Sequence, residues 1–191
     1  GIYENCPNDE AHELFKLPEF VNKMMENKWL GSKTGQGFYK KEGKDILTLD
    51  LDTLEYRANK KASFATLELT KTIEKPIDRF KVLVTGKDKA GDFYRKNFAS
   101  MFQYCSNRIP EITDAFYKID DAMKAGFGWE NGPFEIWDAI GIEKGIELMK
   151  AEGYQPASWV TDMLASGNTS FYSVKDGATH FYSITNKKVE K

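Results

Sequence analysis

Residues Ile119–Ile142 read IDDAMKAGFGWENGPFEIWDAIGI, a stretch in which one helix is predicted to end and another to begin. Apolar residues around its start recur at intervals of four, three and four, which predicts an amphipathic helix: Ile112, Phe116, Ile119 and Met123. Gly126 and Gly128 are predicted to end this helix, because glycine readily adopts the left-handed conformation found at helix C-termini.

The second helix of this stretch is predicted to begin after Asn131-Gly132. Pro133 suits the first helical position, where its missing N–H is not needed. Glu135 then lies in the first turn, where the helix dipole favours a negative charge. Phe134, Trp137 and Ile140 repeat every three residues and predict one aromatic helix face. The stretch therefore predicts a helix–turn–helix in a mainly α protein.

The run DDAMKAGFGWENGPFEIWDAIG, at 120–141, resembles the helical C-terminal domain of the L-3-hydroxyacyl-CoA dehydrogenases of fatty-acid β-oxidation. In that family the glycine pair, the G-P-F-E and a following W-D or L-D occur in this order. The resemblance implies a mainly α fold, like the C-terminal domain of 6-phosphogluconate dehydrogenase, in tandem and with small β-hairpins. We interpret the signature side chains as architectural: Gly126, Gly128, Gly132, Pro133, Phe134, Glu135, Trp137 and Asp138.

A second motif, KTGQGFY at 33–39, permits several interpretations. A phosphate loop requires glycine where Ser32 stands, and a dinucleotide fingerprint requires glycine where Lys40 stands. A glycine-rich turn that leads into an aromatic strand is favoured. The motif also resembles the K-T-G-x-G-F-Y that closes the same family's C-terminal domain, through the structural residues Lys33, Thr34, Gly35, Gly37, Phe38 and Tyr39.

This closing motif precedes the stretch at 119–142, which is the wrong order for a single copy and indicates an internal repeat. Pro18–Met25 aligns with Pro156–Leu164 if the second copy has one extra residue after its proline. Each segment then runs through a glycine-bearing turn to an aromatic pair, Phe38-Tyr39 in the first copy and Phe181-Tyr182 in the second. The resemblance implies such tandem duplication for the large multifunctional members of the family.

The expected organisation is therefore one truncated unit followed by one complete unit. We predict the back half of a first C-terminal unit at 1–45, a connecting hairpin and helices at 46–86, a complete second unit at 87–185 and a charged tail at 186–191. Within these ranges we predict a helix from Pro18, hairpins at Asp50–Thr53 and at Asp176-Gly177, a helix over 88–107 and another over 143–152.

Composition excludes several classes of function. The 191 residues carry a net charge of −2, so no basic surface for nucleic acid is expected. No apolar run approaches the roughly 18–20 residues that cross a bilayer. Cys6 and Cys105 stand in no metal or redox spacing, which favours a reducing, cytoplasmic location. His12 and His180 are too few and too isolated for a metal site, so no metal is expected.

The resemblance implies reversible oxidation of an L-3-hydroxyacyl-CoA to a 3-ketoacyl-CoA with NAD. The resembled enzymes carry the catalytic His–Glu pair on an N-terminal Rossmann domain. No Rossmann fingerprint is present in these residues, so no catalytic residue is assigned and no cofactor is expected to bind here; NAD would bind the missing domain.

Four polar residues remain as candidates for chemistry. Asn107 resembles the asparagine of the family's V-N-R segment, and we interpret it as a relic or as a hydrogen-bonding helix end. Asp120, Asp121 and Glu135 are acid–base candidates, but charges on the outside of helices or at helix ends are the favoured interpretation.

The expected function is that of the C-terminal portion of a 3-hydroxyacyl-CoA dehydrogenase, a monomer or weak dimer that is inactive alone. It would form a wall of the acyl-CoA cleft and supply pseudo-dimer packing, with an N-terminal Rossmann domain as its partner. A standalone acyl-CoA-binding or assembly module is the alternative. A third hypothesis keeps the fold but assigns another NAD-dependent hydroxyacid or sugar-acid dehydrogenase.

Overall fold

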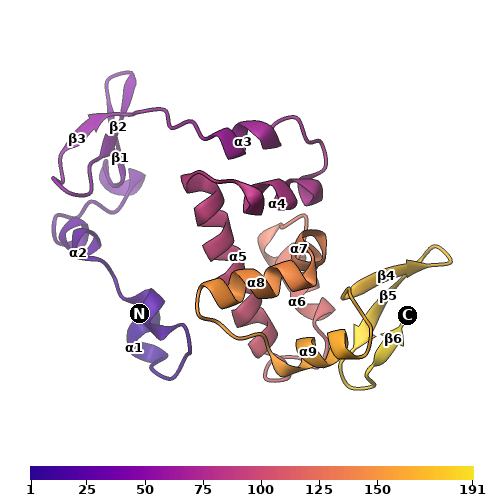
Figure 1. Ribbon diagram of the computed structural model, residues 1–191. Coiled ribbons are helices and arrows are strands. Elements are labelled where there is room, and N and C mark those ends of the chain that lie inside the picture. The colour runs from indigo at the N-terminus through magenta and orange to yellow at the C-terminus, as the bar shows by residue number, and fades with distance from the viewer. The chain divides into compact units, whose positions relative to one another are not determined.

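The computed structural model describes all residues from Gly1 to Lys191 and divides them into two compact units (Figure 1). Unit 1 comprises Gly1–Ala62 and unit 2 comprises Ser63–Lys191. The connecting segment predicted at 46–86 is divided between them, because its hairpin forms part of a sheet in unit 1 and its helices belong to unit 2.

Unit 1 consists of short helical segments followed by an antiparallel sheet of order β1-β2-β3. Glu19 and Lys23 form an ion pair on its longest helix, with Nζ and Oε1 2.7 Å apart. The carboxylate of Asp50 accepts from the backbone N–H of Asp52 and forms the turn of the predicted hairpin. The elements are α1 (Ile2–Asn5), the 3₁₀ turn η1 (His12–Phe15), α2 (Glu19–Glu26), the 3₁₀ turn η2 (Ser32–Thr34), β1 (Tyr39–Glu42), β2 (Asp45–Leu49) and β3 (Tyr56–Ala58).

Unit 2 is mainly helical, as the sequence predicts, and ends in a second antiparallel sheet of order β4-β5-β6. None of its helices combines the length and apolar content that crossing a bilayer requires. The elements are α3 (Ala65–Thr70), α4 (Pro76–Thr85), α5 (Lys89–Asn107), α6 (Tyr117–Phe127), α7 (Pro133–Ile140), α8 (Ile142–Ala151), α9 (Ser158–Ala165), β4 (Tyr172–Lys175), β5 (Ala178–Ser183) and β6 (Lys188–Glu190).

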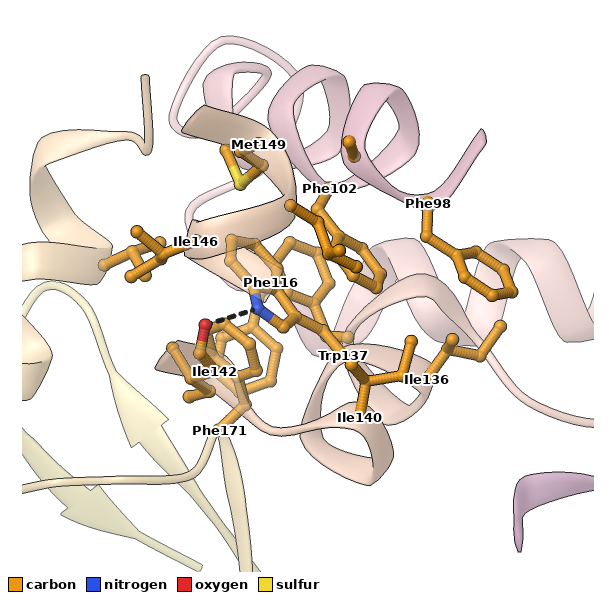
Figure 2. Close-up of a cluster of buried hydrophobic side chains, with 14 of the residues drawn as sticks. Phe98, Phe102, Phe116, Ile136, Trp137, Ile140, Ile142, Ile146, Met149 and Phe171 are labelled. Carbon is orange, nitrogen blue, oxygen red and sulfur yellow. Dashed lines mark hydrogen bonds between the residues drawn. The ribbon is translucent and has the colours of Figure 1, made fainter. Parts of the chain in front are cut away.

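Aromatic rings fill the core of unit 2 (Figure 2). The rings of Phe102 and Trp137 stack with centroids 4.7 Å apart and planes within 8°. Phe171 meets Trp137 edge-on at 5.2 Å, and Phe116 lies 5.2 Å from Phe134. All five side chains are at most 1% exposed, so their burial is a major source of the stability of this unit.

Two boundaries of the helix before the glycine turn differ from the prediction. Helix α6 begins at Tyr117, so Ile112 lies outside it and is 65% exposed. Gly126 lies within the helix, and Gly128 alone takes the left-handed conformation, with φ of 67°. Spacing alone had included Ile112, because a four-residue interval continues an apolar stripe whether or not the backbone there is helical.

The tail predicted at 186–191 contains a strand. Residues of β6 pair antiparallel with β5, with Tyr182 opposite Val189 and Ser183 opposite Lys188. The strand forms because β5 would otherwise leave a row of unpaired N–H and C=O groups at the sheet edge. The short, charged segment at 188–190 therefore forms a strand because it pairs with β5, and not because its own residues favour a strand.

Both units place a helix before a three-stranded antiparallel sheet, and this order revises one detail of the repeat alignment. The first strand of each sheet starts at a tyrosine preceded by phenylalanine, Phe38-Tyr39 in unit 1 and Phe171-Tyr172 in unit 2. Phe181-Tyr182 lies in the second strand, β5. Phe171-Tyr172 therefore holds the position at the start of its sheet that Phe38-Tyr39 holds in unit 1, and the connection from α9 to β4 is shorter than that from α2 to β1.

Asp88 precedes α5, and its carboxylate joins the starts of two helices. Oδ2 accepts from the backbone N–H of Thr66 in α3 at 2.9 Å, and Oδ1 accepts from the N–H of Gly91 in α5 at 3.0 Å. These hydrogen bonds, the one from Thr66 first, lower the pKa of Asp88 to about 2. Asp88 is therefore the N-cap of α5 and also fixes the start of α3.

Replacing Asp88 with alanine is expected to reduce the free energy of unfolding near neutral pH. The difference in free energy of unfolding between the variant and the wild type is expected to become smaller in acid. The folded-state pKa lies below the reference value of 3.8, so ionised Asp88 stabilises the fold above that value. This contribution is lost as the pH falls through the folded-state pKa. Urea denaturation from about pH 6 to about pH 2 measures the effect.

Asp92→Ala is the matched control on the same helix. The Asp92 side chain is 52% exposed and its carboxylate pairs with Lys96 at 3.0 Å. An equal dependence of stability on pH in the two variants would contradict the assignment of Asp88 as a shared cap.

Candidate functional site

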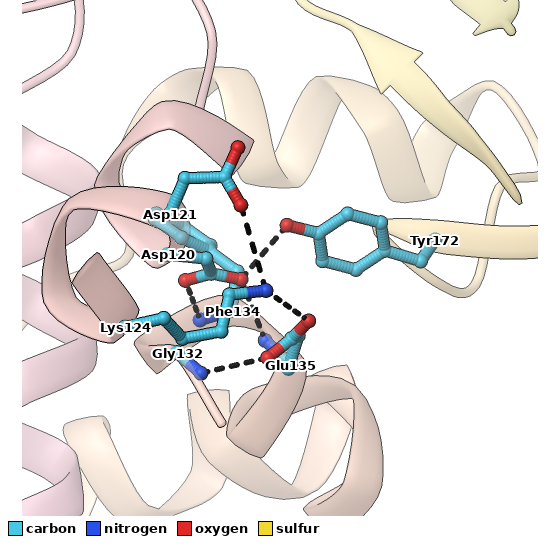
Figure 3. A network of polar contacts seen from close by, with 7 residues as sticks. All are labelled: Asp120, Asp121, Lys124, Gly132, Phe134, Glu135 and Tyr172. Atoms are coloured by element: carbon cyan, nitrogen blue, oxygen red, sulfur yellow. Dashed lines mark hydrogen bonds and ion pairs between the residues drawn. The ribbon is translucent and has the colours of Figure 1, made fainter. Parts of the chain in front are cut away.

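Asp120 is the centre of the polar network within the signature stretch (Figure 3). Its Oδ1 accepts from the backbone N–H of Phe134 at 2.9 Å, and its Oδ2 accepts from the N–H of Glu135 at 3.1 Å. Oδ2 also accepts from the hydroxyl of Tyr172 at 2.8 Å. The Asp120 side chain is 0% exposed. One carboxylate from α6 thus joins the start of α7 and the first strand of the C-terminal sheet.

This arrangement depends on the glycine that precedes α7. The N–H groups of Phe134 and Glu135 are at the second and third helical positions, where an N-cap side chain normally accepts. Gly132 is the N-cap residue and has no side chain, so Asp120 supplies the acceptor from another helix. A Cβ on Gly132 would collide with the side chain of Asp120. Glycine is therefore required here by close approach.

The environment of Asp120 determines its chemistry. Burial raises its pKa to about 6, while the hydrogen bonds from Phe134, Tyr172 and Glu135 oppose the rise. Because both carboxylate oxygens are occupied and no part of the side chain reaches solvent, Asp120 is not available to a substrate. The interpretation of Asp120 as a charge on the outside of a helix is wrong, since the start of α7 covers it.

Glu135 and Asp121 lie where the sequence predicted, at a helix start and on a helix surface. Oε2 of Glu135 accepts from the N–H of Gly132 at 2.7 Å, so Glu135 caps its own helix. Its other oxygen pairs with Nζ of Lys124 at 2.8 Å, and Asp121 approaches the same ammonium at 3.5 Å. This hydrogen bond with Glu135 raises the pKa of Lys124. The three charges are partners of one another and leave no free acid or base.

Tyr172 and Asp138 form a second link that sequence reasoning did not find. Asp138 accepts from the backbone N–H groups of Phe171 and Tyr172, each at 2.8 Å. Burial raises the pKa of Asp138 to about 6, and the two backbone hydrogen bonds act in the opposite direction. Tyr172 thus binds Asp138 through its backbone and Asp120 through its hydroxyl. The sequence holds no local signal for this link, because the residues that donate to Asp138 are 33 and 34 positions away.

Trp137 is the packing centre of the signature. Its Nε1–H donates to the carbonyl of Ile142 at 3.1 Å, so the one polar group of the indole is satisfied. Gly145 on α8 lies against the indole, and a Cβ at that position would collide with it. The predicted aromatic face of α7 is confirmed, since Phe134 and Trp137 are 0% exposed and Ile140 is 7% exposed.

The KTGQGFY motif folds as the predicted glycine-rich turn into a strand. The Thr34 hydroxyl accepts from the N–H of Leu30 at 3.0 Å, and Gly35 has φ of 85°. The carbonyl of Gly37 accepts from the hydroxyl of Tyr56 at 2.6 Å. Lys33 is exposed, and Phe38 and Tyr39 are 49% and 61% exposed. The turn precedes an antiparallel strand, which is not the setting of a phosphate-binding loop.

The remaining candidates contribute no reactive group. Asn107 is the last residue of α5 and is half-buried. Cys105, on the same helix, is half-buried, and burial raises its pKa to about 12, so its thiol stays protonated.

A pocket of about 450 Å³ lies beside the signature turn. Its walls come from α4, α5, α7 and the turn between α6 and α7, and they are mainly aromatic and aliphatic. Arg79, Asn97, Glu130 and Asn131 are the charged and amide residues of its lining. This size and lining are within the range of small-molecule sites. The wall residues include Phe80, Tyr94, Phe98, Met101, Trp129 and Ile136.

Comparison with known proteins gives a consistent result. Residues 98–178 match the family model described as 3-hydroxyacyl-CoA dehydrogenase, C-terminal domain. A Bacillus subtilis protein named "Probable 3-hydroxyacyl-CoA dehydrogenase" is 41% identical over 182 residues, which are 95% of this chain and 23% of that protein. A Rickettsia felis protein named as a fatty acid oxidation complex trifunctional enzyme is 28% identical over 68% of this chain and 17% of its own length.

A Rickettsia prowazekii protein with the same kind of name is 25% identical over 74% of this chain and 19% of its own length. The chain thus spans less than a quarter of the length of the curated relatives it matches. No solved structure matches the chain. The family model covers α6, α7 and the residues that their polar network joins, from Asp120 to Tyr172.

Proposed function

We propose that the chain is the C-terminal portion of an NAD-dependent L-3-hydroxyacyl-CoA dehydrogenase of fatty-acid β-oxidation, because residues 98–178 match the C-terminal domain of the 3-hydroxyacyl-CoA dehydrogenase family. The observation that carries the proposal is the 41% identity over 95% of the chain to a protein with that name. The reaction would move a hydride from C3 of the hydroxyacyl group to NAD and the hydroxyl proton to a base.

The residues of this chain do not fit NAD. A dinucleotide site needs a glycine-rich turn between a parallel strand and a helix. The glycines at Gly35 and Gly37 instead lie between a 3₁₀ turn and an antiparallel strand. We therefore assign NAD and the catalytic acid–base pair to a Rossmann domain elsewhere in the polypeptide.

The role proposed for this chain is to form a wall of the acyl-CoA cleft and to supply the packing of a tandem, pseudo-dimeric C-terminal region. The apolar pocket between α4, α5 and α7 supports the first role, because an acyl chain needs apolar walls. The helix-then-sheet order in both units supports the second. The proposed partners are acyl-CoA and the Rossmann domain, with a cytoplasmic location and the isolated chain a monomer or weak dimer.

The 191-residue chain alone is expected to show no oxidation of NADH with acetoacetyl-CoA, whereas the full-length product of its gene is expected to turn over. The reason is that Asp120, Asp138 and Glu135 are all engaged in hydrogen bonds and ion pairs within the fold. Absorbance at the NADH maximum under matched molar concentrations measures both rates. Substantial turnover by the 191-residue chain would contradict the assignment of catalysis to another domain.

Isothermal titration with acetoacetyl-CoA separates the proposed role from the alternative of a standalone binding module. If the chain is part of an enzyme, the full-length protein is expected to bind acetoacetyl-CoA in the titration and to reduce it in the NADH assay. If the full-length protein binds acyl-CoA but never oxidises NADH, a non-catalytic binding module replaces the dehydrogenase.

A further inference from the structure

We propose that the pocket between α4, α5 and α7 accepts an uncharged aromatic ring at the far end of the acyl group, so that aryl-terminated acyl-CoAs bind more tightly than straight-chain ones of similar length. The inference rests on the proposed function, because it takes this pocket to be part of the acyl-CoA cleft. All residues that line the pocket belong to unit 2.

One side of the pocket is a cluster of rings that contact one another. The ring of Phe98 meets that of Phe80 edge-on, with centroids 5.6 Å apart, and lies 5.7 Å from that of Tyr94. Phe80 comes from α4, and the other two rings come from α5. Phe98 and Ile136 are 6% and 4% exposed and lie on the same side of the core in Figure 2. They are the most buried residues of the lining and give the pocket an apolar floor.

The other aromatic residue of the lining is Trp129, which stands apart from this cluster. Trp129 follows Gly128, whose left-handed conformation ends α6, and its backbone N–H donates to the carbonyl of Met123 at 3.5 Å. The indole lines the pocket, is 38% exposed and contacts no other aromatic ring of the chain. The backbone thus holds a tryptophan side chain at the pocket without a ring to pack against. A ring bound in the pocket is placed to contact this indole as well as the cluster.

The charged groups of the lining favour an uncharged ligand group. They are Arg79 and Glu130, whose charges are opposite. The guanidinium of Arg79 is turned toward the backbone, because its Nε donates to the carbonyl of Ile73 at 2.7 Å and its Nη2 to that of Glu74 at 3.4 Å. A carboxylate or phosphate in the pocket would meet the negative charge of Glu130 and no free guanidinium fork. The pocket therefore suits the uncharged end of an acyl group and not the nucleotide end of CoA.

An aromatic end gains more from these walls than an alkyl end of similar length. Both would bury apolar area in a pocket of about 450 Å³. Ring pairs in edge-on or offset geometry add a contribution beyond buried area, equivalent to about 2- to 10-fold in affinity for one pair. The thioether of Met101, also in the lining, makes favourable contacts with the edges of aromatic rings. The walls therefore predict a preference for the aryl end of about 2- to 10-fold.

Isothermal titration of phenylhexanoyl-CoA and decanoyl-CoA into the full-length product of the gene tests the proposal. The two acyl groups are similar in length, and neither carries a 3-hydroxyl or 3-keto group, so binding is measured without turnover. Because the CoA moiety is common to both ligands, the ratio of their affinities reports only the acyl end. Phenylhexanoyl-CoA is expected to bind about 2- to 10-fold more tightly.

Trp129→Leu in the full-length protein removes the indole and keeps an apolar side chain at the pocket. This variant is expected to reduce the preference for phenylhexanoyl-CoA to less than about 2-fold. Phe127→Leu is the matched control, because Phe127 is 75% exposed at the end of α6 and does not line the pocket. The control is expected to keep the wild-type ratio of affinities.

Equal affinities for the two acyl-CoAs in the wild-type protein overturn the proposal, as does tighter binding of decanoyl-CoA or no binding of either ligand. An aryl preference that Trp129→Leu and Phe127→Leu reduce equally, or that neither reduces, also overturns it. In both cases the ring would lie outside this pocket.

The NADH assay with acetoacetyl-CoA separates this test from the proposed function, because the acetoacetyl group has no long acyl end. Turnover of acetoacetyl-CoA without an aryl preference in the titration would retain the dehydrogenase and reject the aryl pocket. An aryl preference that depends on Trp129, in a full-length protein without turnover, would retain the pocket and reject the dehydrogenase.

Discussion

Replacing Asp120 with alanine is expected to lower the free energy of unfolding of the chain by about 3 to 5 kcal/mol. The substitution leaves the N–H groups of Phe134 and Glu135 and the hydroxyl of Tyr172 without their acceptor. Each buried donor without an acceptor costs about 1 to 3 kcal/mol. Helix α7 also loses the carboxylate at its N-terminus. Chemical denaturation followed by far-ultraviolet circular dichroism measures the loss.

Asp121→Ala is the control for this prediction, because it removes a carboxylate from the adjacent position of the same helix. The Asp121 side chain is 67% exposed and pairs only with Lys124. Its removal is expected to change the free energy of unfolding by less than about 0.5 kcal/mol. Asp120→Asn keeps the size of the side chain but retains only one of its two acceptor oxygens. An intermediate loss of unfolding free energy is therefore expected. Equal losses for Asp120→Ala and Asp121→Ala would show that the buried network does not hold α7.

Replacing Trp137 with alanine is expected to cost about 3 to 5 kcal/mol of unfolding free energy. The indole is 0% exposed, stacks on Phe102 at 4.7 Å and contacts Phe171 at 5.2 Å. Its removal opens a cavity that the surrounding helices fill only in part. The carbonyl of Ile142 also loses its donor. Thermal and urea denaturation followed by circular dichroism measure the effect without relying on tryptophan fluorescence.

Trp129→Ala provides a matched control, since it removes the same side chain from an exposed position in the turn before α7. Trp129 is 38% exposed, so a much smaller loss is expected. Trp137→Phe is expected to cost less than Trp137→Ala and more than Trp129→Ala. It retains most of the packing but cannot donate a hydrogen bond to the carbonyl of Ile142. A loss for Trp137→Ala no larger than that for Trp129→Ala would contradict the place of Trp137 at the centre of the core.

The starts and ends of most helices could be predicted from the sequence, because short-range chemistry determines them. Pro133 opens α7, Gly128 ends α6 in the left-handed conformation, and α5 spans Lys89–Asn107 against a predicted range of 88–107. Asp176-Gly177 forms the predicted hairpin turn between β4 and β5. The order of residues at 120–141 also pointed to the C-terminal domain of the 3-hydroxyacyl-CoA dehydrogenases, and the model of that domain matches residues 98–178.

The role of Asp120 could not be predicted from the sequence. An aspartate followed by a second aspartate on an amphipathic helix is usually solvated, and nothing local distinguishes the buried one from its exposed neighbour. The same limit applies to β6, which is ordered by the open edge of β5, and to Asp138, whose donors are 33 and 34 residues away.

The sequence by itself determined where the backbone turns, which helix faces are apolar and which family the chain resembles. Tertiary structure alone decided which charges are buried and which aromatic pair begins the second sheet as Phe38-Tyr39 begins the first. The physical reason is that Asp120 receives hydrogen bonds from residues 14 and 52 positions away. A buried carboxylate is stable only when such donors converge on it, and their convergence is a property of the folded chain.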